Sequence, residues 1–142
     1  MNFKDVIKLS RERVIILDDN EYGIELVAFD RMITNWSWAN KKAIVLDICG
    51  YTGWKIPTIK ELESIVNQCS FEEISSMFEE NPKSFCSYDG EKLNLLWSSD
   101  IYRENAGGGR KEIFIYDYKK LQRCVTIDNY NINCCYIRYA DK

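Results

Sequence analysis

Apolar residues recur at helical intervals in the segment that follows the first proline of the chain. Leu62, Ile65 and Val66 lie three and four residues apart, and this spacing places their side chains on one face of an α-helix. The sequence therefore predicts a short amphipathic helix over residues 58–68.

The start of this helix is marked by three neighbouring residues. Pro57 disfavours a helical backbone at the residue before it, so the helix cannot begin earlier. Thr58 and Glu61 have the T-x-x-E spacing of a capping box, in which the hydroxyl accepts from the Glu61 N–H and the carboxylate accepts from the Thr58 N–H. Trp54 precedes this corner, and we expect its large ring to be buried as an anchor of the core.

Two further helices are predicted on either side of the first. One covers residues 36–49, where Asn35 can cap the first turn and alanines line one face. The other begins with a second capping box, formed by Ser70 and Glu73, and ends before Pro82.

Strand-like runs occur near the start of the chain and fill its last third. Each is rich in β-branched and aromatic residues and is followed by turn or polar residues. These runs are residues 13–19, 22–30, 93–99, 111–118, 121–128 and 134–140. The first two are predicted to form a hairpin, and the segments 106–110 and 118–121 are predicted to be turns.

Helices in the first half followed by strands are typical of the α+β class. We predict a single domain over residues 1–142, with two or three short helices packed on an antiparallel β-sheet. The content of 46% hydrophobic and 29% charged residues is ordinary for a soluble globular domain. Four Trp, nine Tyr and six Phe suit a β-rich core or an aromatic binding face.

Charge and hydropathy restrict the partners that the chain is expected to have. The net charge of −3 disfavours general binding to nucleic acid. No apolar run approaches the ~20 residues of a membrane helix, so no membrane partner is expected. Basic residues do gather in the segment 103–123, whereas acidic residues gather in 61–91.

The chain has six cysteines and no histidine. The absence of histidine excludes Ser-His-Asp and Cys-His catalysis. The chain also lacks the C-x-x-C pair that is typical of zinc sites. We therefore expect no metal, no cofactor and reduced, buried thiols. The cysteines are Cys49, Cys69, Cys86, Cys124, Cys134 and Cys135.

The first residues carry charges throughout and no apolar segment typical of an export signal. This pattern predicts a cytoplasmic location. Two alternatives to this location are export by a route without a signal peptide and incorporation into a phage particle.

Several separated motifs, from about residue 22 to residue 140, resemble one bacterial family, the Lcl-type C-terminal domain of collagen-like adhesins. They are a tryptophan before a helix that ends in Cys-Gly, then Gly-Trp-Lys-Ile-Pro-Thr-x-x-Glu-Leu, then Trp-Ser-Ser, and a final Tyr-Ile-Arg. The chain departs from the family pattern at Lys55 and Ile56, usually Arg-Leu, at Asp100, usually a small hydroxyl residue, and at Tyr139, usually a cysteine.

The resemblance implies a C-type-lectin-like fold, related to that of the formylglycine-generating enzymes that modify sulfatases. It also implies that a set of residues has a structural role. These residues are Trp38, Trp54, Pro57, Thr58, Glu61, Trp97 and Arg138.

Two loop segments, 102–110 and 128–133, carry the candidate binding residues. The second has acid and amide oxygens around a tyrosine, which can bind sugar hydroxyls or form an Asx-rich turn. The glycines of 106–110 could cradle a phosphate only beside a helix N-terminus, and a strand follows them, so a plain hairpin turn is predicted. The candidate residues are Tyr102, Arg103, Arg110, Asp128, Asn129 and Tyr130.

Three functions are compatible with these patterns. The first is a non-catalytic module that binds a glycan or protein ligand, with the oligomeric state open. The second, implied by the resemblance, is a thiol enzyme that holds copper(I) at Cys134 and Cys135, although neighbouring strand residues face opposite sides of a sheet. The third is an intracellular interaction protein of phage or defence origin.

Overall fold

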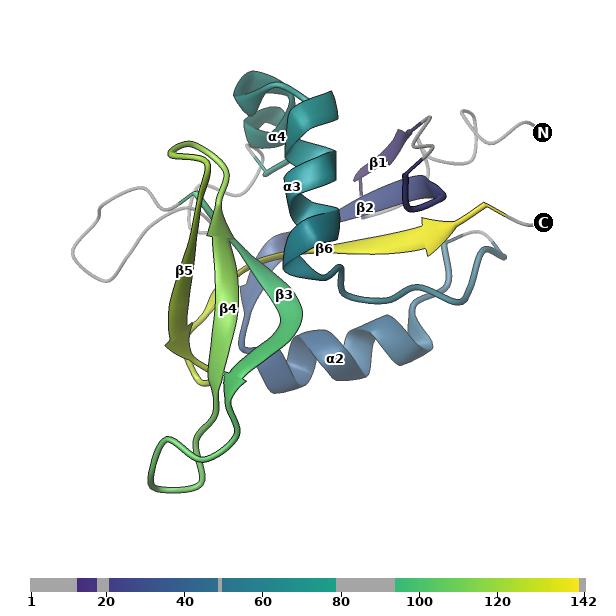
Figure 1. Ribbon diagram of the computed structural model, residues 1–142. Coiled ribbons are helices and arrows are strands. Elements are labelled where there is room, and N and C mark those ends of the chain that lie inside the picture. The colour runs from purple at the N-terminus through teal and green to yellow at the C-terminus, as the bar shows by residue number, and fades with distance from the viewer. Residues whose placement is uncertain (1–12, 18–20, 49, 79–93, 141–142) are drawn as a thin grey trace.

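A six-stranded β-sheet forms the framework of the protein in the computed structural model, which describes residues 13–17, 21–48, 50–78 and 94–140 (Figure 1). Across the sheet the strand order is β1-β2-β6-β3-β4-β5. The strands are β1 (Arg13–Ile16), β2 (Ile24–Thr34), β3 (Leu95–Arg103), β4 (Glu112–Asp117), β5 (Gln122–Ile127) and β6 (Ile132–Tyr139).

The sheet is mixed, whereas the sequence predicted an antiparallel one. Neighbouring strands pair antiparallel except β3 and β6, which are parallel at the register pair Leu96–Asn133. This arrangement arises because β6, the last strand, returns to the middle of the sheet and pairs antiparallel with β2 on its other side.

Three helices in the described residues cover the two faces of the sheet. They are α2 (Trp36–Val45), α3 (Ile59–Gln68) and α4 (Phe71–Phe78). Helices α3 and α4 lie over one face, and α2 lies over the other (Figure 1).

The central strands β2 and β6 are therefore buried on both faces. Phe29 and Cys135 belong to the core under α3 and α4, whereas Ala28 and Cys134 belong to the core under α2. Strands covered on both sides have few polar positions, which explains the unbroken apolar runs at 26–29 in β2 and 134–137 in β6.

The predicted elements agree with the structure in type and order. The hairpin β1–β2, the four later strands and the three helices all lie where the sequence placed them. Helix α2 ends at Val45 and not at residue 49, because Asp47 accepts from the Gly50 N–H and Ile48 pairs with Tyr51 in a short bridge. The predicted end of the third helix near Pro82 lies outside the described residues.

Both capping boxes are confirmed. At α3, Thr58 N–H donates to Glu61 Oε1 at 2.9 Å, and Glu61 N–H donates to Thr58 Oγ1 at 3.2 Å. At α4, Ser70 and Glu73 make the same two bonds at 3.2 and 3.1 Å. In the first box Glu61 is buried and Thr58 is half-buried, whereas both residues of the second box are exposed.

The predicted burial of Trp54 and Trp97 is also confirmed. Trp54 Nε1 donates to the Tyr51 carbonyl at 2.8 Å, and Trp97 Nε1 donates to the Thr34 carbonyl at 2.7 Å. Each indole thus buries its ring and satisfies its one polar group.

Asp100 has a role that the sequence did not reveal. Its Oδ2 accepts from the Ile59 N–H at 2.8 Å, which adds a further cap to the first turn of α3. One residue earlier, Ser99 N–H donates to the Pro57 carbonyl at 2.9 Å. Strand β3 is thereby bonded to the corner that starts α3.

The resemblance implied a structural role for Trp38, whose side chain is 63% exposed. The buried face of α2 carries Ala39 and Ala43, and Trp36, at helical spacing from both, packs against the same core. Trp36 Nε1 donates to the Ser98 carbonyl at 2.8 Å. The tryptophan that anchors α2 is therefore Trp36.

Arg138, for which the resemblance implied a structural role, contacts the segment that precedes α3. Its Nε donates to the Thr52 carbonyl at 2.7 Å, and its guanidinium lies 5.2 Å from the centre of the Tyr51 ring. These contacts join β6 to the segment between α2 and α3.

We expect Trp54→Ala to lower the free energy of unfolding by roughly 3–5 kcal/mol, because it leaves a cavity in the core under α2. Trp38→Ala is the matched control and should change it by less than about 0.5 kcal/mol, because the ring is exposed. Urea unfolding of both variants measures the difference, and similar losses would contradict the assignment of these two rings.

Thr58→Ala should destabilise the protein by about 1 kcal/mol, because it removes the oxygen that accepts from the Glu61 N–H. Thr58→Ser keeps this oxygen and should lose less. Thermal unfolding monitored by circular dichroism compares the two variants. An equal loss in both would show that the methyl group, and not the cap, matters at this position.

Candidate ligand-binding site

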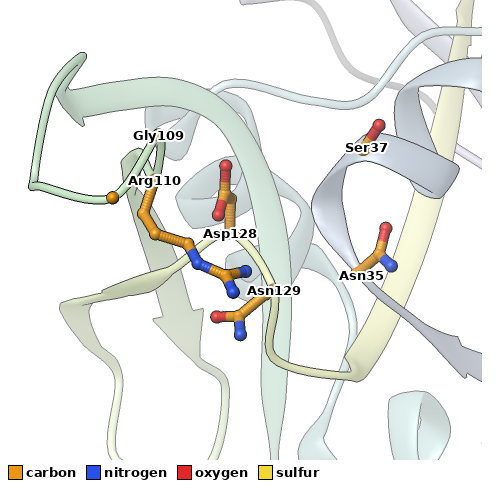
Figure 2. A pocket seen from close by; sticks show the side chains of 7 residues that line it. Asn35, Ser37, Gly109, Arg110, Asp128 and Asn129 are labelled. Atoms are coloured by element: carbon orange, nitrogen blue, oxygen red, sulfur yellow. The ribbon is translucent and has the colours of Figure 1, made fainter.

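A polar pocket of about 240 Å³ lies between two turns of the sheet and the first turn of α2 (Figure 2). The β3–β4 turn, the β5–β6 turn and the start of α2 each contribute to its wall. The lining residues are Asn35, Ser37, Gly108, Gly109, Arg110, Asp128 and Asn129. Three of the six predicted binding residues, Arg110, Asp128 and Asn129, are thus brought together.

The β3–β4 turn places Arg110 at the edge of the pocket. Gly107, Gly108 and Gly109 all have positive φ, which only glycine adopts readily. Two backbone bonds, from Ala106 N–H to the Arg110 carbonyl and from Arg110 N–H to the Gly107 carbonyl, close the turn. Figure 2 shows the Arg110 side chain reaching from this turn toward Asp128 and Asn129.

The predicted hairpin turn is confirmed, and a strand follows the glycines in the chain. In the fold, the first turn of α2 lies across the pocket from them (Figure 2).

Asp128 fixes the three parts of the pocket relative to one another. Its N–H donates to the Lys111 carbonyl at 2.9 Å, and its Oδ2 accepts from the Lys111 N–H at 3.2 Å. Its carbonyl accepts from the Trp36 N–H at 3.1 Å. Asp128 therefore bonds to the start of β4 and to the start of α2.

Asn35 and Ser37 form the α2 side of the pocket, and the sequence analysis did not include them in the site. Asn35 was predicted as a helix cap, and its Oδ1 does accept from the Trp38 N–H at 2.9 Å. No local signal places either residue near Arg110, because they meet only through the fold of the whole sheet.

The pocket contains a cationic hydrogen-bond donor, the Arg110 guanidinium, and an anionic acceptor, the Asp128 carboxylate. Within the described part of the chain, Arg110 and Asp128 form no ion pair with each other, although both line the pocket. The Ser37 hydroxyl and the Asn129 amide add groups that donate and accept. A ligand with both kinds of group can therefore bond to the guanidinium and the carboxylate together.

The other three predicted binding residues do not line this pocket. Tyr102 packs edge-on against Phe114, with ring centres 5.3 Å apart. Arg103 Nε lies 3.1 Å from Glu112 Oε1 and pairs with it. Tyr130 is exposed next to the β5–β6 turn but is not part of the pocket wall.

The basic segment 103–123 does not form a continuous cationic surface. Apart from Arg103, Lys111 lies 3.7 Å from Glu104, and Arg123 pairs with Glu63 of α3. Opposite charges thus compensate much of the segment, and its bases lie at both ends of the β4–β5 hairpin.

A second pocket, of about 370 Å³, lies between α3 and the end of the β4–β5 hairpin. Its wall includes Glu63 and Arg123, which bond to each other, together with Tyr116, Leu121 and Gln122. We favour the first pocket as the ligand site because its charged groups are not paired with each other.

The adjacent thiols Cys134 and Cys135 lie on opposite faces of β6, and both are fully buried. They cannot converge on one copper ion in this arrangement. Burial, with contributions from Cys135 and Asp30, raises the pKa of Cys134 well above its usual range, and burial also raises the pKa of Cys135. Both thiols are therefore protonated and unreactive at neutral pH.

No protein-family model matches this chain, and no curated protein matches it either. In the described residues, no helix has the length and apolarity needed to cross a membrane. No group of three or more His, Cys, Asp or Glu in the same part of the chain could hold a metal ion.

We expect thiol titration of the denatured, non-reduced protein to find about six free thiols, since the cysteines in the described residues, Cys69, Cys124, Cys134 and Cys135, are unpaired. Cys49 and Cys86 lie outside the described residues, so this count also tests them. In the folded protein, Cys124, which is half-buried, should react before Cys134 and Cys135. Fewer thiols in the denatured protein would indicate disulfides.

Proposed function

We propose that this protein is a non-catalytic binding module on a C-type-lectin-like scaffold. Its pocket at Arg110 binds a hydroxyl-rich ligand, such as one sugar ring of a glycan. The observation that carries this proposal is the presence of Arg110 and Asp128 in one pocket without an ion pair between them.

A sugar ring suits this pair of charged groups. A hydroxyl group both donates and accepts, so neighbouring hydroxyls can accept from the guanidinium and donate to the carboxylate. Hydrogen bonds to charged groups are worth about 1.5–3 kcal/mol each. The volume of about 240 Å³ is below the ~300–1,000 Å³ of drug-sized sites, so it suits a single ring.

The proposed C-type-lectin-like scaffold is supported by contacts between the motifs that resemble the Lcl-type domain. The Pro57 carbonyl accepts from Ser99, and Lys55 exchanges two backbone bonds with Ile137. Motifs that are separated in the sequence therefore form one connected junction. Fold alone does not establish function, so the pocket chemistry carries the argument for binding.

The alternative of a thiol enzyme has less support. Its two adjacent thiols are buried on opposite faces of the sheet, and no cysteine lines either pocket described above.

A glycan array probed with the full chain, followed by calorimetric titration of the best ligand, tests the proposal. We expect Arg110→Ala to weaken binding about 10- to 100-fold, because the variant loses one hydrogen bond between the ligand and a charged group. Arg103→Ala is the matched control, because Arg103 lies outside the pocket, and it should change the Kd less than about twofold.

Equal losses in the two arginine variants would contradict the assignment of the pocket. Failure to bind any glycan, together with turnover of a thiol substrate by the copper-loaded chain that Cys135→Ser abolishes, would contradict the binding proposal itself.

A further inference from the structure

Helix α2 exposes large apolar side chains although its opposite face is also apolar. Trp38 is 63% exposed, Ile44 83% and Val45 76%. The inward face carries Ala39 and Ala43, which are buried in the core. A surface helix normally has polar residues on its outer face, so this exposure requires an explanation.

The exposed residues form a single stripe along the helix. Trp38, Lys41 and Val45 are spaced by three and four residues, which places them in one row, and Ile44 lies three residues after Lys41. We call Trp38, Lys41, Ile44 and Val45 the α2 stripe. Its length covers most of the ten residues of the helix.

The charge of this surface is positive. The sequence of α2, WSWANKKAIV, contains two lysines and no acidic residue. Lys41 Nζ lies 5.2 Å from the centre of the Trp38 ring, whereas Lys42 pairs with Asp30 at 2.9 Å. Lys41 is thus the cation within the apolar stripe.

We propose that the α2 stripe docks an acidic amphipathic helix of a partner protein. Trp38, Ile44 and Val45 would bury the apolar face of that helix, and Lys41 would pair with a carboxylate beside it. No residue of the α2 stripe lines the ligand pocket, so the inference goes beyond the proposed function.

Charge argues against a second copy of this chain as the occupant. In a two-fold antiparallel contact between two α2 helices, Trp38 of one copy would pack near Val45 of the other. The same register would place Lys41 of one copy close to Lys41 of the other. Like charges in contact destabilise such a dimer, whereas an acidic helix meets Lys41 favourably.

A displayed library of helix-forming peptides, randomised on one face, can be selected on the folded full chain. We expect the enriched peptides to carry apolar residues at spacings of three and four, flanked by Asp or Glu. Ile44→Ser and Lys41→Glu should each weaken the selected peptides at least tenfold. Lys60→Glu, an exposed charge reversal on α3, is the control and should leave their binding unchanged.

A charge-swapped selection makes the test specific. The Lys41→Glu chain should instead enrich peptides with Lys or Arg at the flanking positions, and its folding can be verified by circular dichroism. Glycan binding at the Arg110 pocket should not change in this variant, so failure of this inference and failure of the proposed function remain distinguishable.

Three results would overturn the inference. One is enrichment of peptides that bind the Ile44→Ser chain as well as the unchanged chain. Another is concentration-dependent dimerisation, seen by sedimentation, that Lys41→Glu strengthens. The third is binding to phosphatidylserine vesicles that depends on Trp38 and Lys41 while no acidic peptide is enriched, which would assign the stripe to a lipid surface.

Discussion

The rest of this structure depends on the bonding of one buried carboxylate, Glu61, which is 4% exposed at the start of α3. A buried charge is costly unless its oxygens have partners, and here both have them. Glu61 accepts from the Thr58 N–H and the Tyr139 hydroxyl, and Lys55 Nζ lies 3.3 Å from it. Asp100 caps the same turn from β3. The first turn of α3 is thereby fixed to both β3 and β6.

This corner also determines where the ligand pocket forms. Because β3 is bonded to the corner, the Ser98 carbonyl is held where the Trp36 indole can donate to it. That bond joins residues 62 positions apart and sets the start of α2 against the sheet. The backbone of Trp36 then donates to Asp128, which brings the β5–β6 turn to the same place. The pocket is thus a consequence of core packing, because the core sets the positions of the turns that line it.

Features set by neighbouring residues could be predicted from the sequence, and features set by the assembled sheet could not. Both capping boxes follow from spacings of three residues, and the hairpins follow from local alternation and turns. The roles of Asp100 and Ser37 depend on elements far away in the chain, so no local pattern indicates them. The resemblance drew attention to Trp38, whereas the buried face of α2, which carries Ala39 and Ala43, includes Trp36.

Amide hydrogen exchange, measured by NMR, tests the central role of the buried corner most directly, because the chain offers two capping boxes of the same type. The N–H groups of Thr58 and Glu61 should exchange only through global unfolding, with a free energy equal to that of the whole domain. Those of Ser70 and Glu73, in the exposed box, should exchange through local fraying at a much lower free energy. Equal, low protection of the two boxes would contradict the view that the corner at Glu61 holds the fold together.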